Sequence, residues 1–139
     1  TNLYAAPEYL KEYGMPLTPQ DLDNHRIIAY GAADSPIRAM SFAERVGRDD
    51  AGPRKAALTV NNVPAMLRAV EAGLGTADLP CSMVSAVPRL IRVLEDFTGP
   101  SFDLYFIYPS DLKRSKRIGA FRDFLTGEVE AFRSSPLRQ

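Results

Sequence analysis

The sequence has 139 residues, which is enough for one domain of ordinary size but short for two. Hydrophobic residues make up 45% and charged residues 24%, and these fractions exclude a disordered, collagen-like or membrane-embedded chain. Lys and Arg together number 17, as do Asp and Glu, so there is no net positive charge to attract DNA and we do not expect this chain to bind DNA by itself.

The first 31 residues predict a strand, two short helices and a second strand. Leu3 to Ala5 form a short apolar run, Pro7 suits the first position of a helix and Gly14 suits its end. Thr18 is a good N-cap for a second short helix. The segment "RIIAYG", residues 26–31, is β-prone and closes on a glycine, so it predicts a strand.

The pattern from residue 32 to residue 60 is weaker. "AADSPIRAM" (32–40) predicts a loop, because Asp, Ser and Pro disfavour regular structure. We interpret "AMSF" (39–42), "ERVGR" (44–48) and "AALTV" (56–60) as strands, with "DDAGP" (49–53) as a turn.

Residues 61–75, "NNVPAMLRAVEAGLG", predict an amphipathic helix packed on the core. Asn61 or Asn62 can cap its first turn, and Gly73 or Gly75 can provide a left-handed end. Apolar residues recur at spacings of three or four, which places them on one helix face: Val63, Met66, Leu67, Val70 and Leu74.

Strands and helices continue to alternate towards the carboxyl end. "TADLP" (76–80) and "LIRVLED" (90–96) predict strands, and "CSMVSAV" (81–87) predicts a short helix between them. "SFDLYFIYP" (101–109) is apolar on both faces, which is typical of a central strand. This alternation predicts an α/β layered fold. Apolar positions also trace one stripe of a long terminal helix: Ile118, Phe121, Leu125, Val129 and Phe132.

No group of side chains predicts catalysis or metal binding. His25 has no second histidine or nearby cysteine, so we assign it a structural role. Cys81 is interpreted as a packing residue, with a cryptic hydrolase nucleophile as the alternative. Asp49 and Asp50 lie in the expected turn, without the further oxygen ligands that a hard cation needs. The basic cluster "LKRSKR" (112–117) is interpreted as solvated surface, with a partner site as the alternative. We expect no catalytic residue, no metal and no cofactor.

The cellular setting can be predicted only in outline. One cysteine cannot form an internal disulfide, which fits a reducing cytoplasm. No apolar run approaches the ~20 residues that a membrane helix requires, so we expect no membrane contact. The sequence starts at Thr1 without Met, which suggests a fragment of a longer polypeptide. We therefore expect a cytoplasmic fragment.

Three segments resemble the effector-binding domain of LysR-type transcriptional regulators. They are "LYAAPEYLKEYGMPLTPQDLDNHRIIAY", "LTVNNVPAMLRAVEAGLGTADLPCSMV" and "LIRVLEDFTGPSFDLYFIYPSDLKRSKRIGAFRDFL". The resemblance implies an α/β fold like a periplasmic binding protein of type II, with two subdomains joined by crossover strands. Residues 1–97 would form the second subdomain nearly complete. Residues 98–139 would supply a crossover strand and the C-terminal helix of the first.

The resemblance also implies a ligand site in the cleft between the subdomains. A helix amino end at such a cleft binds a carboxylate through unpaired backbone N–H groups and its positive dipole end. The alternatives are a plain N-cap for Asn62 and an exposed loop position for Ser35. The expected ligand-binding residues are Ser35, Pro36, Ile37, Asn62, Val63 and Thr76.

The function implied is that of a regulatory sensor. A small, anionic metabolite would close the cleft and so control DNA binding by an N-terminal winged helix-turn-helix that has no counterpart here. The expected partners are the small-molecule effector and further copies in a homodimer or higher oligomer, with DNA contacted only through the missing domain. The alternative is a solute-binding module of a transport system, which shares the two-lobed architecture.

Overall fold

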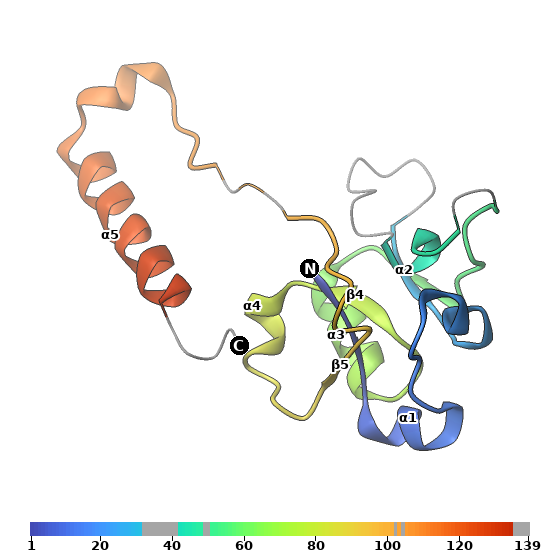
Figure 1. Ribbon diagram of the computed structural model, residues 1–139. Helices are drawn as coiled ribbons and strands as arrows, with labels where there is room; N and C mark the ends of the chain where they lie inside the picture. The colour runs from blue at the N-terminus through green and yellow to red at the C-terminus, as the bar shows by residue number, and fades with distance from the viewer. Residues whose placement is uncertain (32–41, 49–50, 102, 104, 135–139) are drawn as a thin grey trace. The chain divides into compact units, whose positions relative to one another are not determined.

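The computed structural model describes residues 1–31, 42–48, 51–101, 103 and 105–134. The chain divides into two compact units, Thr1–Ser101 and Phe102–Gln139. Figure 1 shows the elements of the two units along the chain.

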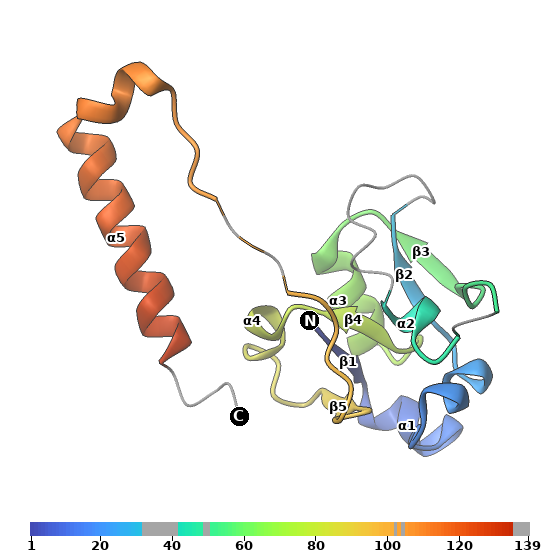
Figure 2. The same ribbon diagram turned by 45° about the horizontal axis from the view of Figure 1, so that its top comes forward.

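The first unit contains five short strands. β1 (Asn2–Ala5) pairs antiparallel with β4 (Ala77–Leu79) on one side and with β5 (Ile91–Val93) on the other. β2 (Ile28–Tyr30) and β3 (Leu58–Val60) form a parallel pair, and Figure 2 shows them side by side. Each of these strands confirms a strand that the apolar, β-prone runs predict.

A parallel bridge joins the two sheets. It links Ile27 to Thr76. Around it, the Ile28 amide donates to the Thr76 carbonyl and the Thr76 amide donates to the Arg26 carbonyl, both at 2.9 Å. Gly75 lies so close to Arg26 that a Cβ at this position would collide with the Arg26 carbonyl oxygen. The strands therefore follow one another in the order β3, β2, β4, β1, β5 as one mixed layer.

Two short helices follow β1, as predicted. α1 (Pro7–Tyr13) starts with a proline and ends at Gly14, whose φ of 84° is in the region that favours glycine. η1 (Pro19–Asn24) starts after Thr18, but it is a 3-10 helix rather than an α-helix. The Asp21 carboxylate accepts the Thr18 amide at 2.8 Å, which satisfies a donor at the helix start.

The region before β3 corrects one prediction and tests another at a single residue. α2 (Phe42–Arg45) is a helix, so the strand predicted over 44–48 is wrong. Of the strand predicted over 39–42, only Phe42 is described, and it begins α2. The local pattern failed because a distant side chain, that of Arg54, binds the carbonyl oxygens of Ala43 and Val46 and stabilises this turn of helix. In the turn expected over 49–53, Asp49 and Asp50 lie outside the described residues.

The helix predicted after β3 is confirmed. α3 (Val63–Glu71) has Asn62 as its N-cap, and Gly73 with φ 72° follows its end. Leu74, predicted on the apolar face, is exposed instead. The α3 residues buried against the sheet are Met66, Leu67, Ala69 and Val70. A short helix, α4 (Cys81–Val84), follows β4 as predicted.

The second unit consists of a 3-10 turn and a long helix. η3 (Ser110–Arg114) precedes α5 (Lys116–Arg133), which confirms the predicted terminal helix. The strand predicted over 101–109 is not formed at the described residues 105–109. A strand needs a hydrogen-bonded neighbour, and the described residues of this unit contain none. The apolar side of α5 is accordingly exposed, at Phe121, Phe124, Val129 and Phe132.

Candidate functional site

The carboxyl ends of three neighbouring strands meet at one edge of the sheet. β2 and β3 are parallel, and the bridge between Ile27 and Thr76 is parallel too, so β4 runs in the same direction. The chain leaves the three strands at Gly31, Asn61 and Pro80. Ligands of open α/β sheets bind in the crevice outside the carboxyl ends of the strands. This edge is therefore the candidate site.

The first unit begins and ends at the same edge. Asn2, the first residue of β1, pairs with Leu79, the last residue of β4. The Gly99 amide donates to the Thr1 carbonyl at 3.0 Å, which holds the outgoing segment against the incoming one. Both ends of the unit thus lie at the edge where β2, β3 and β4 finish.

The amino end of α3 opens at this edge, directly after β3. The Asn62 side-chain oxygen accepts a hydrogen bond from the Ala65 amide at 2.8 Å, which confirms Asn62 as the N-cap of α3. Pro64 has no N–H, and the Met66 amide already bonds the Asn62 carbonyl at 3.2 Å. Among the described residues, no partner is found for the Val63 amide. The donors that this helix end offers a ligand are therefore the Val63 N–H and the Asn62 side-chain NH₂.

The Asn62 NH₂ group is accessible and weakly held. Its one contact is with the Asn61 side-chain oxygen at 3.4 Å, near the limit for a hydrogen bond. Asn62 is exposed, and Val63 is half-buried. A ligand oxygen can take over the amide donor without breaking the cap, because the cap uses the side-chain oxygen.

Thr76 does not lie at this edge, because it precedes β4 and is therefore at the amino end of that strand, and it faces the interior. It is 1% exposed, and its hydroxyl donates to the Tyr4 carbonyl at 3.0 Å. Both of its backbone polar groups serve the bridge to β2. In this structure its side chain fastens β4 to β1.

Ser35, Pro36 and Ile37 lie outside the described residues. The described chain stops at Gly31, whose amide donates to the Val60 carbonyl at 2.6 Å, and resumes at α2. The segment that carries these three residues therefore starts from the edge where α3 begins.

A buried carboxylate holds the beginning of α2. Both carboxylate oxygens of Asp78, in β4, accept the Ala43 amide, at 3.2 and 3.1 Å. Asp78 is 1% exposed, and this burial raises its pKa to about 7, although hydrogen bonds from Ala43 and Phe42 oppose the rise. The hydrogen bonds between Asp78 and Ala43 therefore link β4 to α2.

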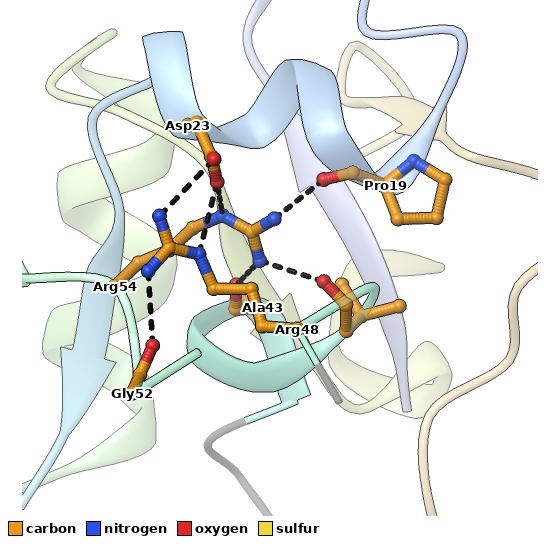
Figure 3. A network of polar contacts seen from close by, with 7 residues as sticks. Pro19, Asp23, Ala43, Arg48, Gly52 and Arg54 are labelled. Carbon is orange, nitrogen blue, oxygen red and sulfur yellow. Dashed lines mark hydrogen bonds and ion pairs between the residues drawn. The ribbon is translucent and has the colours of Figure 1, made fainter. Parts of the chain in front are cut away.

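Arg54 holds the other side of α2 (Figure 3). Its guanidinium donates to the carbonyl oxygens of Ala43, Val46 and Pro19 at 3.1, 2.8 and 2.7 Å, and to the Asp23 carboxylate at 2.6 Å. Its side chain is only 4% exposed. This network ties the segment between β2 and β3 to η1.

The remaining candidate residues from the sequence, His25, Cys81 and the basic cluster, either contact other side chains or lie on the surface. His25 is half-buried, its Nδ1 lies 3.1 Å from the Tyr9 hydroxyl, and burial lowers its pKa. Cys81 accepts a hydrogen bond from the Asn2 amide group at 3.2 Å. The basic cluster spans η3 and the start of α5, and its Lys and Arg side chains are exposed. Within the described ranges, no group of three or more His, Cys, Asp or Glu residues could hold a metal ion.

A shallow apolar groove lies elsewhere on the unit. It has a volume of about 660 Å³ and is bordered by Leu67, Glu71, Met83 and Val87, from α3 and the chain around α4. These α3 residues belong to its middle and carboxyl end, so the groove does not include the amino end at Asn62. No helix in the described part of the chain is long and apolar enough to span a membrane.

Sequence reasoning missed Asp78 and Arg54. A carboxylate inside the apolar run "TADLP" was the available signal for Asp78, because a charge in the middle of a buried strand needs a specific partner. Arg54 carries no such signal, since it follows a polar turn in which an arginine is ordinary.

Comparison with known proteins shows the domain family of the chain and its relatives. Residues 2–130 match the LysR substrate binding domain. The chain is 30% identical over 140 residues to the uncharacterized HTH-type transcriptional regulator YhjC of Escherichia coli (strain K12), covering 92% of this chain and 44% of that protein. It is 28% identical over 130 residues to an HTH-type transcriptional regulator of Xanthomonas campestris pv. campestris (strain 8004), covering 90% and 38%.

A solved structure has the same fold. The regulatory domain of CrgA, a LysR-type transcriptional regulator from Neisseria meningitidis, superposes with a TM-score of 0.67 at 22% identity, over 91% of this chain and 63% of that one. The chain therefore spans less than half of the two sequence relatives and about two thirds of the CrgA domain.

Proposed function

Because the chain belongs to the LysR substrate binding domain family, we propose that it senses a small anionic metabolite for a transcriptional regulator. The metabolite binds in a cleft between the unit Thr1–Ser101 and a second lobe. Its binding controls how a winged helix-turn-helix, supplied by another part of the regulator, engages DNA. Such a regulator works in the cytoplasm, as a homodimer or higher oligomer.

One observation carries this proposal. The amino end of α3 opens at the edge where β2, β3 and β4 end and where the chain enters and leaves the first unit. A ligand at this edge would lie near the segment after Gly99, through which the first unit continues into the second. It is therefore well placed to favour one arrangement of the lobes over another.

The proposed ligand contacts at α3 need no positive side chain. The Val63 N–H and the Asn62 NH₂ donate to a carboxylate or similar anion, and the helix dipole favours negative charge there. Ser35, Pro36 and Ile37 are proposed to border the same cleft. Thr76 lies at the amino end of β4 and its hydroxyl is held by Tyr4, so it is proposed to contribute only by fixing β4 to β1.

We propose that residues 1–97 form one subdomain and that residues 98–139 contribute to the other. The exposed apolar side of α5 supports this division, since such a surface is normally covered. The effector then acts by shifting the population between open and closed arrangements of the subdomains, which requires different affinities for the two.

The test uses the intact regulator and a library of organic acids and amino acids in a thermal-shift assay. Wild-type protein should be stabilised by one class of anion. Asn62→Asp keeps an N-cap oxygen, so the unliganded protein should melt as before. It replaces the donating NH₂ by negative charge, so stabilisation by the anion should be lost.

Asn61→Asp is the matched control, because it adds the same charge one residue earlier and leaves the Asn62 donor intact. It should retain most of the shift. A flat response of the wild type across the library, or an unchanged shift in Asn62→Asp, would refute the proposed site.

A further inference from the structure

Asp78 is a buried carboxyl group whose partners are backbone amides. It lies in the middle of β4 and is 1% exposed. Both of its oxygens accept a hydrogen bond from the Ala43 amide, at 3.2 and 3.1 Å, and the Phe42 amide also donates to it. Among the described residues, no Lys or Arg side chain forms an ion pair with it. Aspartates are seldom fully buried without such a partner, so this carboxyl group needs an explanation.

The charged groups that act on Asp78 oppose one another. The Thr1 amino group, directly before β1, lowers the pKa of Asp78, and the carboxylate of Glu44 in α2 raises it. Burial is the largest influence, and it raises the pKa to about 7 although the α2 amides favour the charged form. The charged and the neutral form of Asp78 are therefore both populated near neutral pH.

The other elements around β4 direct their charged groups elsewhere. β1 places the apolar Leu3 opposite Asp78, and β2 consists of Ile, Ala and Tyr. In α3, the side chains of Arg68 and Glu71 pair with each other at 2.9 Å. Arg54 holds the other side of α2, where its donors bind carbonyl oxygens and a different carboxylate. The protonation state of Asp78 therefore depends on burial and on the α2 amides, rather than on a fixed ion pair.

The charged and the neutral form of Asp78 differ in how well they hold α2. The carboxylate accepts hydrogen bonds on both oxygens, and bonds to a charged acceptor are roughly twice as strong as neutral ones. Protonation turns one oxygen into a donor, so the Ala43 amide keeps at most one uncharged acceptor. The neutral form in turn suits the buried position, because burial penalises charge. Burial and the hold on α2 therefore favour opposite protonation states.

We propose that Asp78 is a proton-controlled clamp, through which pH sets how tightly β4 holds the amino end of α2. On the alkaline side of neutrality, the carboxylate binds the Ala43 amide. On the acid side, a proton weakens this bond, while Arg54 still binds the carbonyl oxygens of Ala43 and Val46. α2 therefore loosens at its amino end and stays attached to the unit. This inference does not depend on an anion at α3.

The test is an NMR titration of the 139-residue chain between about pH 3 and pH 9. It follows the carboxyl carbon of Asp78, the amide proton of Ala43, and the hydrogen exchange of that amide after correction for the intrinsic effect of pH. The two resonances should share one midpoint, at about pH 7. Protection of the Ala43 amide should be about tenfold higher on the alkaline side of that midpoint, because the charged acceptor forms the stronger hydrogen bond.

Three altered chains identify the group that titrates. Asp78→Asn keeps the shape and one acceptor but has no proton to lose, so the Ala43 amide should show no midpoint and should stay at its low protection. Glu44→Gln is the matched control, because it neutralises the other carboxyl group that acts on Asp78, and it should leave the shared midpoint in place at a slightly lower pH. Acetylation of the Thr1 amino group should also preserve the midpoint, at a slightly higher pH.

Two results would overturn the proposal. One is an Asp78 carboxyl carbon that titrates near its ordinary pKa of 3.8. The other is an Ala43 amide whose resonance and protection do not follow the Asp78 midpoint. If Asp78→Asn does not fold, these two measurements on the wild-type chain decide alone.

Discussion

Removal of the Arg54 side chain should unfold the chain far more readily than removal of its neighbour Arg48. Both guanidinium groups bind the Asp23 carboxylate (Figure 3). They differ in burial, because the side chain of Arg54 is 4% exposed and that of Arg48 is 26% exposed. They also differ in their other partners, since Arg54 serves three backbone carbonyls and Arg48 serves one, that of Gly52.

The magnitude follows from the carbonyl oxygens that lose their donor. Arg54→Ala removes the donor to the carbonyl oxygens of Pro19, Ala43 and Val46. Two of these three hydrogen bonds, those to Pro19 and Ala43, are fully buried. A buried acceptor left unpaired costs about 1–3 kcal/mol, so the three together give roughly 3 kcal/mol at the low end. The Asp23 pair is left out, because exposed ion pairs contribute little.

Urea denaturation followed by circular dichroism measures the difference. Arg54→Ala should lower the free energy of unfolding by at least ~3 kcal/mol, a large part of the total for a domain of this size. Arg54→Lys should recover only part of the loss, because an ammonium cannot reach several carbonyls in the fork geometry of a guanidinium. If Arg54→Ala were no more destabilising than Arg48→Ala, the burial argument would be refuted.

Three further outcomes are expected. Gly75→Ala places a Cβ against the Arg26 carbonyl and should destabilise the chain by about 1–3 kcal/mol in the same denaturation assay, whereas an unchanged midpoint would show that β2 and β4 can separate freely. The pKa of Asp78 is about 7 in the folded chain, above its ordinary value of 3.8. Protonation of Asp78 therefore stabilises the folded chain fully below about pH 4, and this stabilisation is lost as the pH rises to about 7. The loss amounts to roughly 4 kcal/mol of the free energy of unfolding. Asp78→Asn should remove this dependence of stability on pH in thermal melts recorded between about pH 4 and pH 7. An unchanged pH dependence would contradict the role assigned to Asp78. The apolar side of α5 should cause self-association in light scattering, and replacing Phe121 and Phe124 by Ser should weaken it; a clean monomer at high concentration would contradict this.

The elements predicted correctly are those whose signals lie within a few residues. α3 has a capping residue, a regular apolar face and a glycine end, all inside the stretch from Asn61 to Gly75, and it forms as predicted. α1 and α5 follow the same logic. The family and its α/β fold class, like that of periplasmic binding proteins, are confirmed by similarity along most of the chain.

The errors fall where distant contacts override the local pattern. The segment 44–48 has a strand-like sequence, but the guanidinium of Arg54 binds the carbonyl oxygens of Ala43 and Val46 and holds this region in a helical turn. The doubly apolar segment 101–109 shows the reverse case, since its pattern suits a buried strand but the described residues of its unit offer no second strand. Sequence patterns report which surfaces are apolar, and they do not report what covers them.

The candidate site was predictable in position but not in detail. Asn62 and Val63 could be placed at a helix start after a strand from cap signals alone, and a strand end is where ligands of such sheets bind. The direction of a single side chain was not available, as Thr76 shows. It follows the glycine end of α3 as expected, yet its hydroxyl points to the Tyr4 carbonyl inside the sheet.

β4 connects the features that matter for function. Thr76, directly before it, pairs with Ile27 and bonds to β1, and Asp78, in its middle, holds α2. Cys81, just after its end, accepts the bond from Asn2 where the chain enters the unit. Because the side chains of this short stretch bind both β1 and α2, a displacement of β4 must change the contacts with both. A ligand at the strand ends would therefore act through β4 on both neighbouring elements.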